Sequence, residues 1–265
     1  MQKKFSRKVL YFVVPILVVL FAVSHTLSKK SNTSVVSNNL ISEAVSLNAD
    51  TVPVPIIMYH QVKYSGPGKD SVTPEAFESD LQYLEKNGFQ TITMEQLIDY
   101  VYYDVDLPAN PIVLSFDDGY LSNYQYVLPL LKKYNQKIVL SIIGKYTDDF
   151  TETPDSNLEY THVTWDQLNE MLDSGLVEVQ NHTYNLHLKA NGRTGCMRKS
   201  GESFEDYRAA LYDDIDPFQD QISLMTGSIP TTFAYPYGRY SDVSDQILKK
   251  IGFKATLTCD FVINL

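Results

Sequence analysis

Two adjacent carboxylates and two spaced imidazoles are the side chains of this sequence best suited to chemistry. Asp117 and Asp118 directly follow the apolar run 112–116, and His182 lies five positions before His187. Successive side chains leaving a strand point in opposite directions, so one carboxylate can bind a cation while the other stays free as a base. One carboxylate with two imidazoles is a ligand set of catalytic zinc sites and, equally, of non-haem iron enzymes. A metal bound there would lower the pKa of water and polarise a carbonyl group.

Two further polar motifs also lie where predicted strands end. His60 follows the apolar run 54–58 after one tyrosine, and the tripeptide Pro-Tyr-Gly at 236–238 closes another predicted strand. Taken singly, each motif has a plainer explanation, because Asp-Asp-Gly and Pro-Tyr-Gly are common turns and a lone histidine is more often a satisfied polar residue. The joint occurrence of all four motifs at strand ends favours one shared functional site.

Apolar, strand-like runs alternate with helix-like segments along most of the chain. This alternation predicts a parallel sheet covered by helices, and about seven strands favour a closed, irregular (β/α) barrel of the α/β class. In such barrels the chemistry lies at the carboxyl ends of the strands, where the four motifs fall. The predicted strands are 54–58, 90–93, 112–116, 137–143, 176–180, 232–235 and 254–258. The predicted helices are 74–87, 94–102, 122–133, 164–175, 204–225 and 243–251, and 189–201 is predicted to be an inserted loop.

The first residues have the pattern of an export signal. A basic cluster ends at Lys8, and an apolar run follows over 9–23. This pattern keeps the basic end in the cytoplasm and predicts that 1–27 is either a cleaved signal peptide or an uncleaved signal anchor. Residues 28–51, rich in Ser and Asn, are typical of a flexible stalk. The folded domain, 52–265, would then lie on the extracellular face of the membrane or be secreted.

Composition and cysteine usage exclude several classes of protein. The chain has 265 residues, a formal net charge of −10 and a pI near 4.9, which argues against sequence-independent binding of nucleic acid. Cys196 and Cys259 form no Cys-x-x-Cys pair, so zinc ribbons and thioredoxin-like redox sites have no support. Two free thiols are the simpler expectation, with a single disulfide as the alternative. No feature of the sequence indicates an oligomeric state.

Three of the segments together resemble the polysaccharide deacetylases, the family with NodB homology that is also called carbohydrate esterase family 4. Residues 114–120 (Leu-Ser-Phe-Asp-Asp-Gly-Tyr) resemble its TFDDG motif, 164–183 its second motif and 233–238 its third. Met-Tyr-His at 58–60 resembles the branch that acts on poly-N-acetylglucosamine. The resemblance extends from about residue 53 to the end of the chain and implies a NodB-like fold.

The resemblance implies a role for each candidate residue. It makes Asp117 the general base and His60 the general acid. It also implies one divalent metal ion, with zinc as the first expectation and cobalt, nickel or iron as alternatives. The implied metal ligands are Asp118, His182 and His187. The backbone N–H of Tyr237 would help to form an oxyanion hole, flanked by Pro236 and Gly238.

Two departures from the family pattern affect these roles. Many members carry an arginine that orients the base shortly before the proline of the third motif. Here that residue is Tyr235, and Arg239 is the nearest substitute. The usual late Leu-x-His motif, which supplies the acid, is absent because no histidine follows His187. The resemblance of Met-Tyr-His at 58–60 to the poly-N-acetylglucosamine branch implies that His60 is the acid instead.

The function expected from these residues is metal-dependent hydrolysis of N-acetyl groups on an extracellular N-acetylglucosamine polymer, either an exopolysaccharide or peptidoglycan. An O-acetyl esterase acting on xylan or another glycan would need the same residues. A catalytically silent carbohydrate-binding module is the alternative from a different class, although pure binding has no use for a free base beside a metal. The expected partners are the glycan and, through the N-terminal segment, the membrane.

Overall fold

A computed structural model describes residues 9–13, 52–66 and 68–260 of the chain. The predicted stalk and most of the predicted signal or anchor lie outside these residues, so both stay predictions. Within the described part, none of the helices is both long enough and apolar enough to cross a membrane. Cys196, which is buried, and Cys259, which is partly buried, are not joined by a disulfide in the described part of the chain.

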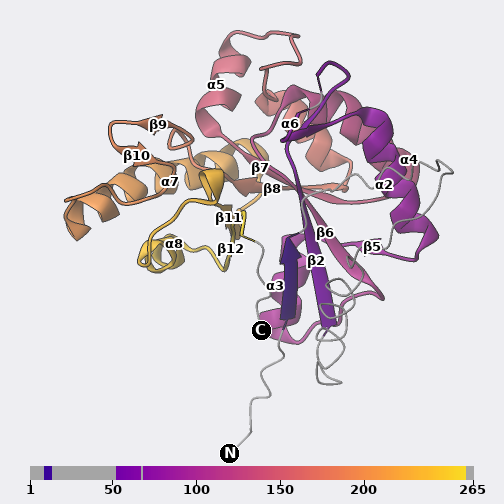
Figure 1. The fold of residues 1–265 in the computed structure, drawn as a ribbon, viewed down its shortest axis with the longest axis horizontal. Coiled ribbons are helices and arrows are strands. Elements are labelled where there is room, and N and C mark those ends of the chain that lie inside the picture. The colour runs from indigo at the N-terminus through magenta and orange to yellow at the C-terminus, as the bar shows by residue number, and fades with distance from the viewer. Residues whose placement is uncertain (1–8, 14–51, 67, 261–265) are drawn as a thin grey trace, which may run out of the picture.

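One parallel sheet forms the centre of the fold (Figure 1). Its strands follow, in spatial order, as β1 (Val9–Val13), β2 (Val52–Tyr59), β6 (Pro111–Phe116), β7 (Ile138–Ile142), β8 (Val177–Asn181), β11 (Thr232–Ala234) and β12 (Ala255–Leu257). A short strand, β5 (Gln90–Thr91), pairs with the start of β6. Neighbouring strands are parallel throughout. The predicted parallel α/β architecture is therefore confirmed, and β1 comes from within the predicted signal or anchor segment.

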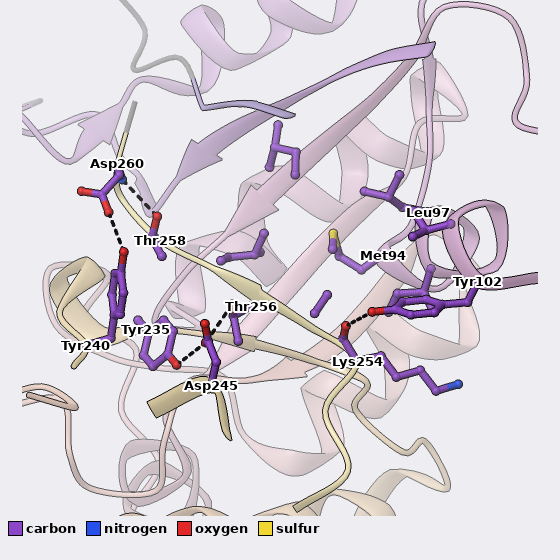
Figure 2. Close-up of a pocket in the computed structure, with 15 residues that line it drawn as sticks. Met94, Leu97, Tyr102, Tyr235, Tyr240, Asp245, Lys254, Thr256, Thr258 and Asp260 are labelled. Carbon is purple, nitrogen blue, oxygen red and sulfur yellow. Dashed lines mark hydrogen bonds between the residues drawn. The ribbon is translucent and has the colours of Figure 1, made fainter. Parts of the chain in front are cut away.

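The sheet is a half-barrel and not the closed barrel that the number of strands predicts. Among the described residues no strand pairing joins β12 to β1 or β2, so the ring is open at this seam. Helix α3 (Met94–Tyr103) packs into the seam, where Met94 and Leu97 share a buried cluster with Ile56 of β2. Leu257 of β12 packs against the same cluster. These side chains keep the two edges apart, and Figure 2 shows the cavity that they help to line.

Side-chain caps fix the residues at which several helices begin. In α2 (Pro74–Lys86) the Thr73 hydroxyl accepts a hydrogen bond from the backbone N–H of Ala76. Helices α3 and α6 (Trp165–Asp173) both begin with a capping box, in which a threonine and a glutamine satisfy each other's backbone N–H. The other helices are α4 (Leu128–Tyr134), α5 (Gly144–Glu152), α7 (Phe204–Thr226) and α8 (Ser244–Ile251). The shorter elements are β3 (Gln61–Val62), β4 (Ser71–Val72), β9 (Lys189–Ala190), β10 (Arg193–Thr194) and the 3-10 turn η2 (Pro236–Gly238).

Two stretches differ from the predicted helices. The predicted helix 122–133 begins as a π-helical turn, η1 (Asn123–Val127), before it continues as α4. Helix α5 is not predicted at all, because it has few apolar residues and no side-chain cap. Its first residue, Gly144, packs so closely that a Cβ there would lie 2.5 Å from the rings of Phe218 and Tyr184. Helix α5 therefore depends on tertiary packing more than on local sequence preference.

Buried aromatic packing lies directly beneath the strand ends where the motifs fall. All the residues of β6 are buried. The ring of its last residue, Phe116, stacks on Tyr59 at a centroid distance of 4.9 Å and meets Phe77 edge-on at 5.4 Å. Tyr59 and Phe116 are also partners in the β2–β6 pairing. Close packing of this kind restricts movement, so His60 and Asp117, the next residues along the two strands, leave the sheet at fixed positions.

Candidate metal centre

The four motifs meet at the carboxyl ends of β2, β6, β8 and β11, as the sequence predicts. Asp117 and Asp118 follow β6, His182 follows β8, and η2 follows β11. Asp117, Asp118 and His182 are buried, whereas the side chain of His187, on the loop after β8, is 19% exposed. The site is therefore a mostly enclosed polar centre with His187 on its solvent side.

Asp118, His182 and His187 form a candidate metal-binding trio. Asp118 Oδ1 lies 3.4 Å from His182 Nε2 and 3.2 Å from His187 Nε2. One ligand atom from each residue lies within 4.8 Å of the other two. Asp118 Oδ1 is buried but accepts no hydrogen bond from the described residues, an arrangement that costs free energy unless a cation satisfies it. The donor set and its geometry therefore fit one divalent metal ion.

Hydrogen bonding and backbone conformation orient two of these ligands. His182 Nδ1 lies 2.8 Å from the carbonyl oxygen of Ala234. When Nδ1 carries the proton and donates it to this oxygen, Nε2 is left free to bind a metal. Asp118 has a left-handed backbone, with φ of 73°, a conformation that aspartate and asparagine adopt more readily than most residues. Both side chains are thus held in place by the surrounding protein.

Electrostatics favours the metal-binding protonation state of two ligands. Burial alone would raise the pKa of Asp118, but the imidazoles of His182 and His187, 3.4 and 3.2 Å from its Oδ1, hold that pKa well below its ordinary value. Burial lowers the pKa of His187 to about 4 despite the nearby Asp118. Burial also lowers the pKa of His182, but the neighbouring carboxylates outweigh it and the net shift is upward. Metal binding would therefore compete with a proton chiefly at His182.

Asp117 lies beside the trio without belonging to it. It is buried, and its Oδ1 accepts no hydrogen bond from the described residues. Burial raises the pKa of Asp117, and the charges of His182 and His60 oppose that rise. His60 and Asp117 directly follow the paired residues Tyr59 and Phe116, and the backbone N–H of Asp117 donates to the Tyr59 carbonyl oxygen at 2.9 Å. The backbone of His60 is anchored by Asn123, whose side-chain amide donates to the His60 carbonyl oxygen at 2.9 Å. The structure thus brings a second carboxylate and a histidine from the end of β2 to the same centre.

The Pro-Tyr-Gly turn lies against the solvent side of the trio. Tyr237 has a left-handed backbone (φ 58°), and its ring centroid lies 4.4 Å from that of His187. Gly238 also has a positive φ, and a Cβ there would lie 2.6 Å from the backbone nitrogen of Cys259, so a larger residue does not fit. Pro236 is buried. The turn is therefore fixed beside His187.

Neither Tyr235 nor Arg239 is joined to Asp117 by a side-chain hydrogen bond or ion pair among the described residues. The Tyr235 hydroxyl donates to Asp245 at 2.7 Å, and both side chains line the seam cavity (Figure 2). Arg239 is exposed, and no hydrogen bond or ion pair joins its side chain to Asp117 in the described part of the chain. The orientation of Asp117 therefore depends on burial and its neighbours in the fold.

One half-buried carboxylate that the sequence does not reveal supports the loop between the two histidines. Asp214, on α7, accepts a hydrogen bond from the backbone N–H of Tyr184 at 2.9 Å and another from Asn185 at 2.8 Å, one at each carboxylate oxygen. Burial raises the pKa of Asp214 to about 6. Local sequence patterns cannot indicate these bonds, because they join residues 30 and 29 positions apart.

Asp214→Ala should loosen this loop and weaken metal binding about tenfold. Removing a group that supports metal ligands typically lowers the metal affinity about 10- to 100-fold, and we expect the lower end of that range. Competition with a chromophoric chelator measures the affinity. Asp213→Ala, at an exposed neighbour on the same helix, is the control and should bind metal like the wild type. Equal affinities of the two variants would contradict a positioning role for Asp214.

Comparison with known sequences identifies the family to which this fold and this site belong. Residues 104–256, more than half of the chain, match the family model for polysaccharide deacetylase. The chain therefore belongs to the polysaccharide deacetylase family, as its three motifs predict.

Three relatives show which branch of the family the chain is similar to. YxkH of Bacillus subtilis is 30% identical over 207 residues, which cover 78% of this chain and 64% of YxkH. Poly-β-1,6-N-acetyl-D-glucosamine N-deacetylase of Escherichia coli K12 is 27% identical over 213 residues, covering 72% and 31% of the two chains. The solved structure of a de-N-acetylase from Aggregatibacter actinomycetemcomitans matches with a TM-score of 0.68 and 27% identity, over 80% of this chain and 90% of that one. The chain thus spans less than two thirds of both curated relatives, and the similarity to the poly-N-acetylglucosamine deacetylase branch is confirmed.

Proposed function

We propose that this chain is a metal-dependent hydrolase that removes N-acetyl groups from a polymer of N-acetylglucosamine outside the cell. Membership of the polysaccharide deacetylase family supports the reaction, and similarity to a poly-N-acetylglucosamine N-deacetylase supports the substrate class. The observation that carries the proposal is the Asp-His-His trio, two of whose members are buried, beside a second buried carboxylate, Asp117, that lies outside it.

Three residues would hold the metal: Asp118, His182 and His187. Zinc is the first expectation, with cobalt, nickel or iron as alternatives. A zinc ion with three protein ligands keeps a position open, and when bound it acidifies water and polarises a carbonyl oxygen. The chain positions the ligands through the Ala234 carbonyl and through Asp214.

Amide hydrolysis also needs a base, an oxyanion donor and an acid, and the chain offers one group for each. Asp117 accepts a proton from the water whose oxygen attacks the acetamide carbonyl carbon. The backbone N–H of Tyr237 donates to the carbonyl oxygen on which negative charge develops. His60 donates a proton to the sugar nitrogen as the C–N bond breaks, and acetate and a free amine leave.

Acetate release from two substrates tests the proposed reaction. One preparation, loaded with zinc, is given N-acetylglucosamine oligosaccharides and, separately, acetylated xylan. We expect release from the N-acetylated substrate. Release from xylan alone would contradict N-deacetylation and favour an esterase, whereas no release from either would favour a silent binding module.

The extracellular location is part of the proposal and is supported by the charge pattern of 1–27. Protease treatment of intact cells that express the full chain tests it. The folded domain should be found in the medium or be accessible at the cell surface. Complete protection in intact cells, with digestion only after lysis, would contradict this location.

His60→Ala should slow N-deacetylation by about 10²–10⁴-fold, because an amine leaves poorly until it is protonated. Hydrolysis of an aryl acetate, whose phenolate leaves without a proton, should fall by less than about tenfold in the same variant. Both rates are measured on one preparation whose metal content is checked. An equal loss on the two substrates would show that His60 is not the acid.

A further inference from the structure

A cluster of aromatic rings that the proposed mechanism does not use lies next to the metal centre. We call it the aromatic wall; its members are Tyr120, Tyr146, Phe150, Tyr160 and His162. The His162 ring is at its centre, with centroid distances of 4.7 Å to Tyr120, 4.6 Å to Tyr146 and 5.8 Å to Phe150. Tyr160 extends the wall by packing on Phe150 at 6.3 Å.

The aromatic wall is joined firmly to the metal-binding loop. Tyr120 comes two residues after Asp118 and forms an antiparallel β-bridge with His162. On either side of this bridge, backbone hydrogen bonds of 2.8 and 2.9 Å join segment 161–163 to segment 119–121. The wall and the Asp118 carboxylate are therefore held at a fixed distance from each other.

Two tyrosines of the wall remain accessible although its centre is buried. His162 is 6% exposed, whereas Tyr146 and Tyr160 are 37% and 51% exposed. His162 Nδ1 is also buried without a hydrogen-bond partner among the described residues. Burying an unpaired polar atom costs free energy, and an apolar residue could fill the same space without that cost. Core packing alone therefore does not explain a histidine at this position. The buried imidazole thus supports aromatic faces that solvent can reach.

Tyr146 lies on a helix that begins against the loop after His182. The backbone N–H groups of Gly144 and Lys145, at the start of α5, donate to the carbonyl oxygens of Thr183 and Tyr184 at 3.1 and 2.9 Å. The aromatic wall is therefore joined to the loops of two proposed metal ligands, Asp118 and His182.

We propose that the aromatic wall is a pyranose-binding subsite, in which Tyr146 stacks the sugar next to the one being deacetylated. A pyranose presents C–H groups on its faces and hydroxyls at its edge, which suits a flat aromatic face with a polar rim. The tyrosine hydroxyls of the wall supply such a rim. This inference rests on the proposed function, because it takes the substrate to be a polymer and not a single sugar.

Binding tests the subsite separately from catalysis. The full chain carrying Asp117→Asn is loaded with zinc and titrated with a β-1,6-linked N-acetylglucosamine pentamer and with the monosaccharide. Adding Tyr146→Ala should weaken pentamer binding about tenfold and leave monosaccharide binding within about twofold, since only the longer ligand reaches the wall. Tyr83→Ala, at an exposed tyrosine on α2, is the matched control and should change neither affinity.

Two conservative variants separate stacking from folding. Tyr146→Phe keeps the flat ring and should bind the pentamer like the parent. Tyr146→Leu keeps an apolar contact with His162 without a ring and should bind as weakly as Tyr146→Ala. Pentamer affinities that are equal in all these variants, or no pentamer binding by the parent, would overturn the subsite. Pentamer binding with the expected ranking, together with no acetate release by the wild type, would overturn the proposed function and leave the subsite standing.

Discussion

Asp117→Asn is expected to lower the rate of acetate release by about 10²–10⁴-fold while the metal stays bound. Asparagine has the same shape as aspartate but cannot accept a proton from water. Asp117 lies outside the metal-binding trio, and no described residue donates a hydrogen bond to its buried Oδ1. The lone pairs of this oxygen are therefore not engaged by a hydrogen bond from the described residues. Initial rates with saturating zinc, together with elemental analysis of the purified variant, measure both effects.

Asp166→Asn, at an exposed position in the first turn of α6, is the control and should keep both its rate and its metal. If Asp117→Asn kept more than about a tenth of the wild-type rate, the loss would be too small for removal of a general base, and Asp117 would not be that base. Loss of the metal together with the activity would make Asp117 a ligand instead.

Asp118→Asn is expected to have the reciprocal effect, removing the metal and leaving the base in place. Asp118 is the acidic member of the trio, and its left-handed φ of 73° makes asparagine a better replacement than alanine. Loss of the negative charge should weaken zinc binding by more than about 100-fold. This loss of affinity is larger than the one expected when a residue that only supports a metal ligand is removed. A competing chelator measures the affinity, and acetate release is assayed at one zinc ion per chain. Zinc affinity equal to that of the wild type would exclude Asp118 as a ligand.

The placement of the candidate site residues at strand ends could be predicted because it follows from local patterns, whereas their roles stay predictions. β6 is an apolar run followed by two aspartates, and β8 ends directly before His182, near the end of the second motif. Parallel strands bring their carboxyl ends to one edge, so Asp118 and His182 meet although they lie far apart in the sequence. The threonine caps of α3 and α6 are equally local, which is why the starts of these helices agree with prediction.

The parts that could not be predicted depend on contacts between distant residues. Helix α5 forms where Gly144 packs against Phe218, and nothing in its own sequence signals a helix start. The seam stays open because α3 occupies it, which a count of strands does not reveal. Asp214 and Tyr146 lack any motif of their own and gain their positions near the metal centre from α7 and α5.

A zinc titration of the metal-depleted chain, with acetate release from an N-acetylglucosamine oligosaccharide as the readout, tests the metal centre most directly. We predict no release without metal, a linear rise as zinc is added and a plateau at one zinc ion per chain. Asp118→Asn should stay near the baseline over the same range. Full release by the metal-depleted chain, unaffected by a chelator, would contradict the metal centre as the source of activity.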